Sequence, residues 1–332
     1  MSISRRTFST AIVATTAGAA LGTSTAVLAQ APAFPTKPVT VLVGYAPGGP
    51  TDIYVRSLAK HLSDLWKQPV IVENRAGASG SIAAQQVLKA PADGYTLLFT
   101  NNAANGAYEV LSPKTATYRT LRDFKAVALF GISPSMMVVR ATLPVKDARE
   151  FVAYAKANPG KVTYGSSAVG SAPHLASELL QNVAGIKMLH VPYNGAAPII
   201  QALLGDTVDM YIGGASTVMG QVRAGKLRAI GAVHPTRLQS APEVPTMGEQ
   251  GFKGVEYASW FGMLASAQVP DALLDQINAD CRKVMELPEM KAQLQTFGIE
   301  YSSYTRPQFL QVVKEEVERS SKVVSEGKIS LE

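Results

Sequence analysis

Cysteines, zinc-binding patterns and nucleotide-binding loops are scarce in this sequence, and each shortage excludes a class of site. One cysteine, Cys281, occurs among the 332 residues, so no disulfide can form within the chain. The four histidines are expected to be isolated from one another, without an HExxH pattern or a cysteine cluster. The stretch GYAPGG lacks the spacing of a dinucleotide-binding loop, and no Gly-Lys-Ser/Thr loop occurs. We therefore expect neither a metal nor a cofactor.

Charged and aromatic residues are also few, at 17% and 7%, whereas hydrophobic residues make up 47% of the chain. This composition is that of a globular protein with enough material for two lobes. The 31 Lys and Arg residues against 25 Asp and Glu residues give a formal net charge of +6. Because the basic residues are scattered rather than gathered with aromatics, the pattern favours attraction of anions over a nucleic-acid groove.

The first thirty residues resemble an export signal. Arg5 and Arg6 precede a stretch rich in Ala, Gly and Thr, and Val27 and Ala29 are the small residues expected before a cleavage site. The arginine pair resembles a twin-arginine signal. An uncleaved membrane anchor is the alternative, although the apolar stretch is short and weakly hydrophobic for a span. We predict that residues 1–29 are a signal peptide cleaved near Ala29 and that the mature chain is periplasmic.

Beyond the signal, strand-like and helix-like segments alternate with short breaks, which is typical of parallel sheets flanked by helices. The first set predicts a lobe with strands at 39–45, 70–74 and 95–100 and helices from 52 and at 81–90. The second set predicts another lobe, complete by about His234, that begins with a helix at 147–160, a strand at 162–167 and a helix at 174–185. The fold class is therefore α/β, with two doubly wound lobes.

The segment 257–266 is strand-like and leads into helices that have no sheet of their own to cover. We expect these helices to return to the first lobe, which gives two chain crossings, near 130–140 and 255–262. Two crossing strands would form a hinge, with a ligand cleft between the lobes. The predicted boundaries are residues 33–133 and 260–332 for lobe 1 and residues 134–259 for lobe 2. The alternative is two sequential domains with a helical tail.

Each lobe has one glycine-containing loop where a strand leads into a helix. In the first, Gly48 and Gly49 permit close backbone approach and Pro50 suits the first helical turn. In the second, residues 165–174, Ser171 is a predicted N-cap. Ligands of open parallel sheets bind beyond the carboxyl ends of strands, and helix N-termini offer free N–H groups to anions. Two such loops facing each other predict a site for a small carboxylate.

A hydrolase is the enzyme alternative, because Ser166, Ser167 and His174 lie close together in the sequence and Asp52 would face them across the cleft. The strand-to-helix nucleophile elbow requires Gly-x-Ser-x-Gly, however, and GSSAVG has one residue too many. Asp52 also suits a structural role, because a carboxylate in the first turn of a helix is stabilised by the helix dipole. We expect no enzyme and assign no catalytic residue.

Several motifs, in order along the chain, resemble one known family. FPTKPVTVLVGYAPGGPTD, YGSSAVGSAPHLASELL, VPYNGAAPIIQALLGDTVDM and VRAGKLRAIGA are similar to segments of the tripartite tricarboxylate transporter substrate-binding receptors, also called the Bug family. The likeness covers nearly the whole mature chain. It implies a type II periplasmic-binding-protein fold whose two lobes close on a ligand.

The resemblance also implies a ligand and a partner. In the family a carboxylate is held by the loops that match Tyr45–Asp52 and Ser166–Ser171, with the loops around Asn101 and Tyr193 nearby. The implied partner is a two-subunit membrane permease, and the chain is expected to be a monomer. A receptor that signals carboxylate occupancy to a sensor protein is the alternative. Where many members have an aspartate this chain has Gly213, which leaves room for a larger or aromatic carboxylate.

The predicted ligand-binding residues come from these loops. Asn and Gly in the two further loops are also explained by turn chemistry alone. The full set is Tyr45, Ala46, Pro47, Gly48, Gly49, Thr51, Asp52, Asn101, Asn102, Ser166, Ser167, Gly170, Ser171, His174, Tyr193, Gly195 and Gly213.

Overall fold

The computed structural model describes residues 34–48, 50–167, 169–193, 195–296, 298–301 and 303–327. The predicted signal peptide and its cleavage site lie outside the described residues. Within the described ranges, no helix is both long enough and apolar enough to cross a membrane.

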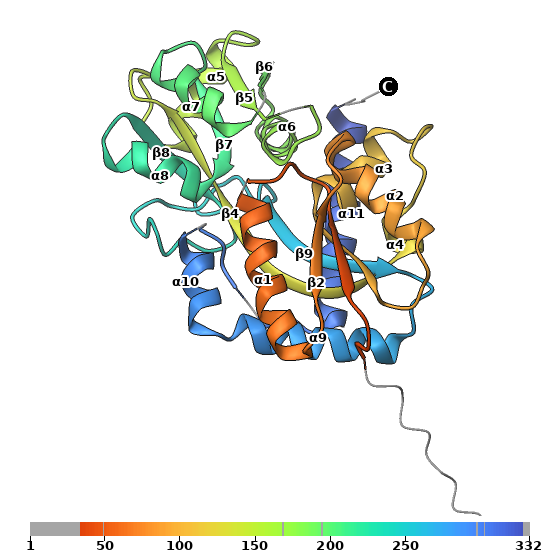
Figure 1. Ribbon diagram of the computed structural model, residues 1–332. Helices are drawn as coiled ribbons and strands as arrows, with labels where there is room; N and C mark the ends of the chain where they lie inside the picture. Colours follow the sequence, from red (N-terminus) through yellow and green to blue (C-terminus); the bar gives the residue numbers. More distant parts are fainter. Residues whose placement is uncertain are drawn as a thin grey trace, which may run out of the picture. The chain divides into compact units, whose positions relative to one another are not determined.

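The first half of the sheet combines parallel and antiparallel strands (Figure 1). Strand β1 (Val39–Val43) lies between β2 (Val70–Asn74) and β3 (Thr96–Asn101) and runs parallel to both. Strand β9 (Ala258–Ser266) pairs antiparallel with β3 on one side and with the long β4 (Phe124–Arg140) on the other. The carboxyl ends of β1 and β3 therefore meet at one edge of this half.

Helices cover both faces of this half. Side chains of α1 (Pro50–Trp66), α9 (Asp271–Met285) and α10 (Pro288–Thr296) share one hydrophobic core with β1 and β3. On the other face, α2 (Ser81–Lys89) and α11 (Arg306–Gly327) pack around a second core. The short elements that complete this half are η1 (Ala78–Gly80), the π-helix η2 (Ala103–Ala107), α3 (Tyr108–Leu111) and α4 (Thr120–Asp123).

The second half begins on β4. Strands β7 (Met210–Gly214) and β8 (Leu227–Val233) pair antiparallel with β4, while β5 (Thr163–Ser166) runs parallel to β7 and to the edge strand β6 (Leu189–Pro192). The helices of this half are α5 (Ala148–Ala157), α6 (Ala172–Ala184), α7 (Ala196–Leu204) and α8 (Ala215–Arg223).

Strand β4 belongs to both halves, because Phe124–Pro134 pairs with β9 and Ser135–Arg140 pairs with β7 and β8. The chain leaves lobe 1 along β4 and returns along β9, after which α9, α10 and α11 pack on the first half. The predicted α/β architecture of two lobes with two crossing strands is confirmed. The residues that divide the lobes stay a prediction.

The C-terminal helix does more than cover lobe 1. Val323 of α11 lies in the same hydrophobic core as Leu175 and Ala176 of α6, and the Asn182 side chain donates a hydrogen bond of 3.3 Å to Glu326. Helix α11 therefore contacts lobe 2 as well as lobe 1.

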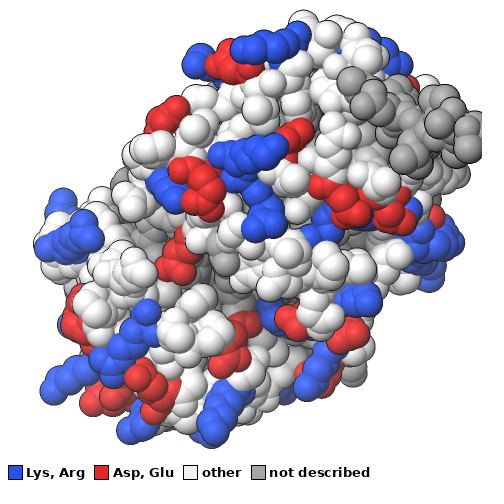
Figure 2. All heavy atoms as spheres, turned by 90° about the horizontal axis from the view of Figure 1, so that it is seen from below, with Lys and Arg blue, Asp and Glu red and all other residues white. Residues whose placement is uncertain are grey.

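Charges of both signs are interspersed on the face that carries α9 (Figure 2). The Lys283 ammonium lies 2.9 Å from the Asp280 carboxylate, and Lys291 lies 2.5 Å from Glu286. Exposed ion pairs of this kind add little to stability. On the face shown, positive and negative side chains are mixed, without a large area of one charge.

Candidate functional site

The loop after β1 is held close to the turn before α2. A Cβ added at Gly44 would lie 2.4 Å from the Cα of Gly80, so the two backbones are already in contact. Gly48 has a φ of +83°, which side chains other than glycine rarely adopt, and its N–H donates to Asp52 Oδ2 at 2.9 Å. The loop is thus folded back onto the first turn of α1.

Asp52 is the centre of this loop's hydrogen-bond network. Its carboxylate is 3% exposed and accepts from Arg56 Nε at 3.0 Å and from Asn74 Nδ2 at 2.8 Å. Asn74 Nδ2 also donates to the Tyr45 carbonyl at 3.0 Å. The hydrogen bond from Arg56 is the largest of the effects that lower the Asp52 pKa to about 2. The carboxylate is therefore ionised and engaged with the protein.

Tyr45 and Asn101 join this loop to the end of β3. The Tyr45 hydroxyl donates to Asn101 Oδ1 at 2.5 Å, and that oxygen also accepts from the Ala103 N–H at 3.0 Å. Burial raises the pKa of Tyr45, so the phenol stays protonated. Asn102, the next residue, is 2% exposed, and its side-chain amide donates to the Ala258 carbonyl of β9 at 3.5 Å.

In lobe 2, Ser166 and His174 are buried and bound to protein partners. Ser166 Oγ lies 2.6 Å from His190 Nε2, and His174 Nδ1 accepts from the Gly170 N–H at 3.0 Å. The rings of His174 and His190 are stacked, with centroids 4.0 Å apart and planes 9° apart. The expectation that the histidines are isolated from one another is wrong for this pair, because β6 places His190 beside the start of α6.

The remaining residues of the lobe 2 loop are more accessible. Ser171 is the N-cap residue of α6, as predicted, and is half-buried. The loop after β6 is attached to this loop, because Tyr193 N donates to the Ser166 carbonyl at 2.8 Å and Gly195 N donates to the Ser167 carbonyl at 3.3 Å. The loops after β5 and β6 therefore form one surface.

Gly170 is the point where this surface touches lobe 1. Its φ is +76°, and a Cβ there would lie 2.4 Å from Leu111 Cδ1 of α3. Leu111 and Ala107 also lie in the core that contains Leu175 of α6. The two lobes are therefore in direct contact beside the loop.

Gly213 gives a different result from the sequence prediction. A Cβ added there would lie 2.0 Å from Cε1 of the Tyr211 ring, and Tyr211 is 2% exposed. The expectation of extra room for a ligand is wrong at this position, because the ring of Tyr211 fills the space beside Gly213.

The predicted set divides by exposure. Gly49 lies outside the described residues. Exposed are Ala46, Pro47 and Gly48; half-buried are Tyr45, Thr51, Asn101, Ser167, Ser171, Tyr193 and Gly195; buried are Asp52, Asn102, Ser166, Gly170, His174 and Gly213.

The hydrolase alternative requires Ser166 or Ser167, His174 and Asp52 to act together. Instead, Ser166 is paired with His190, His174 Nδ1 is occupied by the Gly170 N–H, and Asp52 is bound to Arg56. The geometry does not form a relay from Asp52 through His174 to a serine. Among the described residues, no group of three or more His, Cys, Asp or Glu side chains could hold a metal ion.

Sequence reasoning missed Arg56, Asn74 and His190. Arg56 lies four residues after Asp52 on a helix, a spacing that signals an ion pair. Asn74 pairs in register with Val43, so it ends β2 beside the loop. No local signal links His190 to His174, because their stacking depends on the pairing of β5 with β6.

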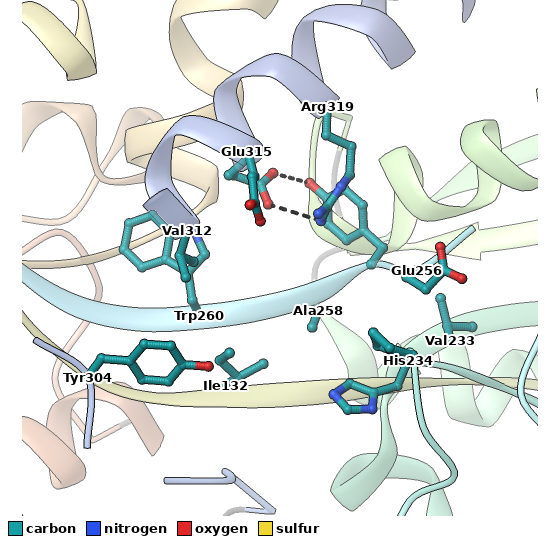
Figure 3. A pocket seen from close by; sticks show the side chains of 13 residues that line it. Ile132, Val233, His234, Glu256, Ala258, Trp260, Tyr304, Val312, Glu315 and Arg319 are labelled. Atoms are coloured by element: carbon teal, nitrogen blue, oxygen red, sulfur yellow. Dashed lines mark hydrogen bonds and ion pairs between the residues drawn. The ribbon is translucent and has the colours of Figure 1, made fainter. Parts of the chain in front are cut away.

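A separate cavity of about 270 Å³ lies on the α11 side of β4 and β9 (Figure 3). Tyr257 donates to Glu316 Oε1 at 2.9 Å, and Arg319 lies 3.7 Å from the other oxygen. None of the predicted ligand-binding residues lines this cavity. Its link to the loops is Ala258, whose carbonyl accepts a hydrogen bond of 3.5 Å from Asn102.

The structure has two α/β lobes joined by crossing strands. Each lobe has a loop that joins the carboxyl end of a parallel strand to the start of a helix. This arrangement is that of a two-lobed solute-binding protein. The model of the tripartite tricarboxylate transporter family receptor matches residues 54–329. The chain belongs to this family of periplasmic solute-binding receptors.

Individual relatives are similar in sequence to this chain over most of its length. The protein BugT of Bordetella pertussis is 32% identical over 300 residues, covering 90% of this chain and 91% of BugT. The structure of Rpa4515 from R. palustris with adipate is 30% identical, with a TM-score of 0.76, and covers 90% and 99% of the two chains. MatC from Rhodopseudomonas palustris with bound malate is 30% identical, with a TM-score of 0.73, and covers 88% and 100%. The family and these neighbours are receptors rather than enzymes.

Proposed function

We propose that this chain is a periplasmic receptor that binds a small carboxylate between its lobes and delivers it to a tripartite tricarboxylate-type membrane carrier. The observation that carries the proposal is the matching position of two loops, one after β1 and one after β5, each leading into a helix in a different lobe. Each helix follows the carboxyl end of a parallel strand, and the first N–H groups of a helix have no partner within the helix itself.

The chemistry of the loops fits an anion that is bound without an arginine clamp. The Arg56 guanidinium is used by Asp52 and Asn74, where it supports the loop. Backbone N–H groups and the hydroxyls of Thr51 and Ser171 are the proposed donors to a carboxylate. This set binds the carboxylate group itself and depends little on what that group is attached to.

Burial separates two roles within the predicted set. We assign ligand contact to the exposed and half-buried residues, together with Gly49. Asp52, Asn102, Ser166 and His174 then support the loops, because their side chains are bound to other protein groups. Adipate and malate, bound by two neighbours at 30% identity, support a dicarboxylate as the ligand.

The test is a thermal-shift screen of residues 30–332 against mono-, di- and tricarboxylates, each beside its neutral amide. A ligand that binds only the native state raises the melting temperature in proportion to RT ln(1 + [L]/Kd). We expect a shift with at least one carboxylate and none with the matched amide. The double variant Gly48→Val with Ser171→Ala should fold but lose that shift. Shifts with no carboxylate, or an unchanged affinity in the double variant, would contradict the proposal.

Delivery is tested separately. Cells that express the carrier should take up the radiolabelled ligand only when this chain is present. Binding without any change in uptake would restrict the function to binding.

A further inference from the structure

Each end of the lobe 2 loop is bonded to a different histidine. At the start of the loop, Ser166 Oγ lies 2.6 Å from His190 Nε2, and Ser166 is fully buried. At its far end, the Gly170 N–H donates to His174 Nδ1 at 3.0 Å. One histidine comes from β6 and the other from α6, so two elements hold one short loop.

The two histidines are also fixed against each other. Their ring centroids are 4.0 Å apart with 9° between the planes, and the nearly parallel Tyr164 ring lies 4.9 Å from His190 and 6.2 Å from His174. His174 is 5% exposed and His190 is half-buried. Each histidine is bonded to one end of the loop, and the two rings are stacked on each other. The stack therefore fixes the distance between the two ends of the loop.

The hydrogen bonds define a proton state. Nδ1 of His174 accepts an N–H, so it carries no proton, and the proton of the neutral ring lies on Nε2. That Nε2 faces Glu178 Oε1 at 3.9 Å. Glu178 also accepts from the Tyr164 hydroxyl and, at 2.6 Å, from Gln181 Nε2. A proton added to His174 Nδ1 would remove the acceptor that holds Gly170.

The second histidine is linked to the first by the stacking of the rings, whereas either atom can donate in its hydrogen bond with Ser166 Oγ. A charge on either ring would lie 4.0 Å from its stacked neighbour, beside the buried His174. Burial lowers the pKa of both imidazoles, and for His174, with the added repulsion of His190, to about 3. Glu178 and the phenol of Tyr164 are the other titratable groups that face the pair, from α6 and β5.

We propose that His174 and His190 act as paired positioning residues, which hold the two ends of the lobe 2 loop, Ser166 and Gly170, in their carboxylate-binding positions, and that a proton on His174 Nδ1 releases Gly170. The inference rests on the proposed function and extends it to the control of affinity by pH. Neither imidazole is required to touch the ligand.

The first experiment separates hydrogen bonding from stacking. Malate and adipate are titrated calorimetrically into the wild type, His190→Gln, which keeps a polar group for Ser166, and His190→Phe, which keeps only the stacked ring. His174→Asn keeps an acceptor for Gly170, and His174→Leu removes it. We expect the two polar variants to bind like the wild type and the two apolar variants to lose about tenfold in affinity, the value of one hydrogen bond. Equal affinities in all four variants would overturn the proposal.

The second experiment uses pH. The wild-type Kd should be constant near neutrality and rise only as the pH falls well below 6.5, the ordinary histidine value, toward the lowered His174 pKa of about 3. In the double variant His174→Asn with His190→Gln, only the protonation of the ligand itself should remain. His234→Asn is the matched control, because His234 is half-buried and bonded within its own turn to Thr236. Parallel curves for the wild type and the double variant would overturn the proposal.

A third measurement needs no ligand, so it distinguishes failure of this inference from failure of the proposed function. The Gly170 amide should exchange with deuterium slowly in the wild type and much faster in His174→Leu, while amides of β1 are unchanged. If neither malate nor adipate binds the wild type, this result still decides whether the histidines hold the loop. Equal exchange in the two proteins would overturn the proposal.

Discussion

The loop after β1 and the loop after β5 have matching positions in the two lobes but are held by opposite kinds of chemistry. Around Asp52, an ionised carboxylate accepts from a guanidinium, an amide and a backbone N–H. Around His174, neutral aromatic rings are stacked on one another. The first network requires a charged Asp52, and the second requires a neutral His174, because His174 Nδ1 accepts from the Gly170 N–H.

The two loops also differ in what surrounds them. A Cβ at Gly48 would meet no atom within 4 Å, whereas one at Gly170 would lie 2.4 Å from Leu111 of the other lobe. Lobe 1 thus presents an open loop supported by a charged network, and lobe 2 presents a packed loop supported by neutral rings. The two loops therefore occupy matching positions in the topology but are stabilised by different interactions.

Removing the charged support should have the largest effect. Asp52→Ala leaves Arg56, Asn74 and the Gly48 N–H without their shared acceptor, so we expect a loss of about 3 kcal/mol in the free energy of unfolding. Urea denaturation measures it. Asp64→Ala on the same helix is the control, because Asp64 is exposed and lies 3.8 Å from Lys60, and should cost under about 0.5 kcal/mol. Similar losses in both variants would show that the Asp52 network does not hold the loop.

The packing difference is tested by one substitution made in each loop. Gly48→Ala and Gly170→Ala both force a side chain into a positive φ, +83° and +76°, at a cost of about 1–2 kcal/mol. Gly170→Ala should cost about 1–3 kcal/mol more, because its Cβ meets Leu111. In the double variant with Leu111→Ala, the extra cost should fall. Equal destabilisation by Gly48→Ala and Gly170→Ala would show that the contact with Leu111 does not distinguish the two loops.

The charge difference predicts two pH windows for stability. The His174 pKa is lowered from 6.5 to about 3 on folding, so the unfolded chain binds more protons and stability is lost as pH falls from 6.5 to 3. The Asp52 pKa is lowered from 3.8 to about 2, so its contribution is complete above 3.8 and is lost below it. His174→Asn should flatten the first window by up to about 1.4 kcal/mol per pH unit, and Asp52→Asn should flatten only the second. Urea titrations between pH 3 and 8 measure the first slope, and an unchanged slope in His174→Asn would contradict the assignment.

The smallest effect is expected at the contact between the lobe 1 loop and β3. Tyr45→Phe removes the hydroxyl that donates to Asn101 Oδ1, which still accepts from the Ala103 N–H. We expect a loss of about 1 kcal/mol in stability and a modest change in affinity. Thermal unfolding with and without ligand measures both, and a loss as large as that of Asp52→Ala would show that Tyr45 is the true support.

Much of the fold could be predicted from local patterns. The strand at 70–74 was predicted to the residue, and Ser171 and Gly185 mark the ends of α6 as N-cap and left-handed C-cap. Apolar periodicity and cap residues act over a few positions, so a single sequence carries them. The π-helix η2 was missed, because it depends on Asn105 leaving helical geometry while bound to Thr100.

The sequence analysis predicted which loops form the site, but it did not predict what each side chain in them contacts. Glycines and helix starts identified both loops, but which side chains face inward depends on neighbours that are distant in sequence. Ser166 appeared to be a ligand contact and is bound to His190, and Gly213 appeared to leave space that Tyr211 fills. Such contacts follow from the pairing of strands and cannot be found from spacing along the chain.

The most direct test of the central claim is a crystal structure of residues 30–332 with the carboxylate that gives the largest thermal shift. The account predicts a carboxylate group within hydrogen-bond distance of backbone N–H groups from both loops, 45–52 and 166–171. A carboxylate bound to one loop alone, or in the cavity beside Trp260 and Arg319, would contradict it.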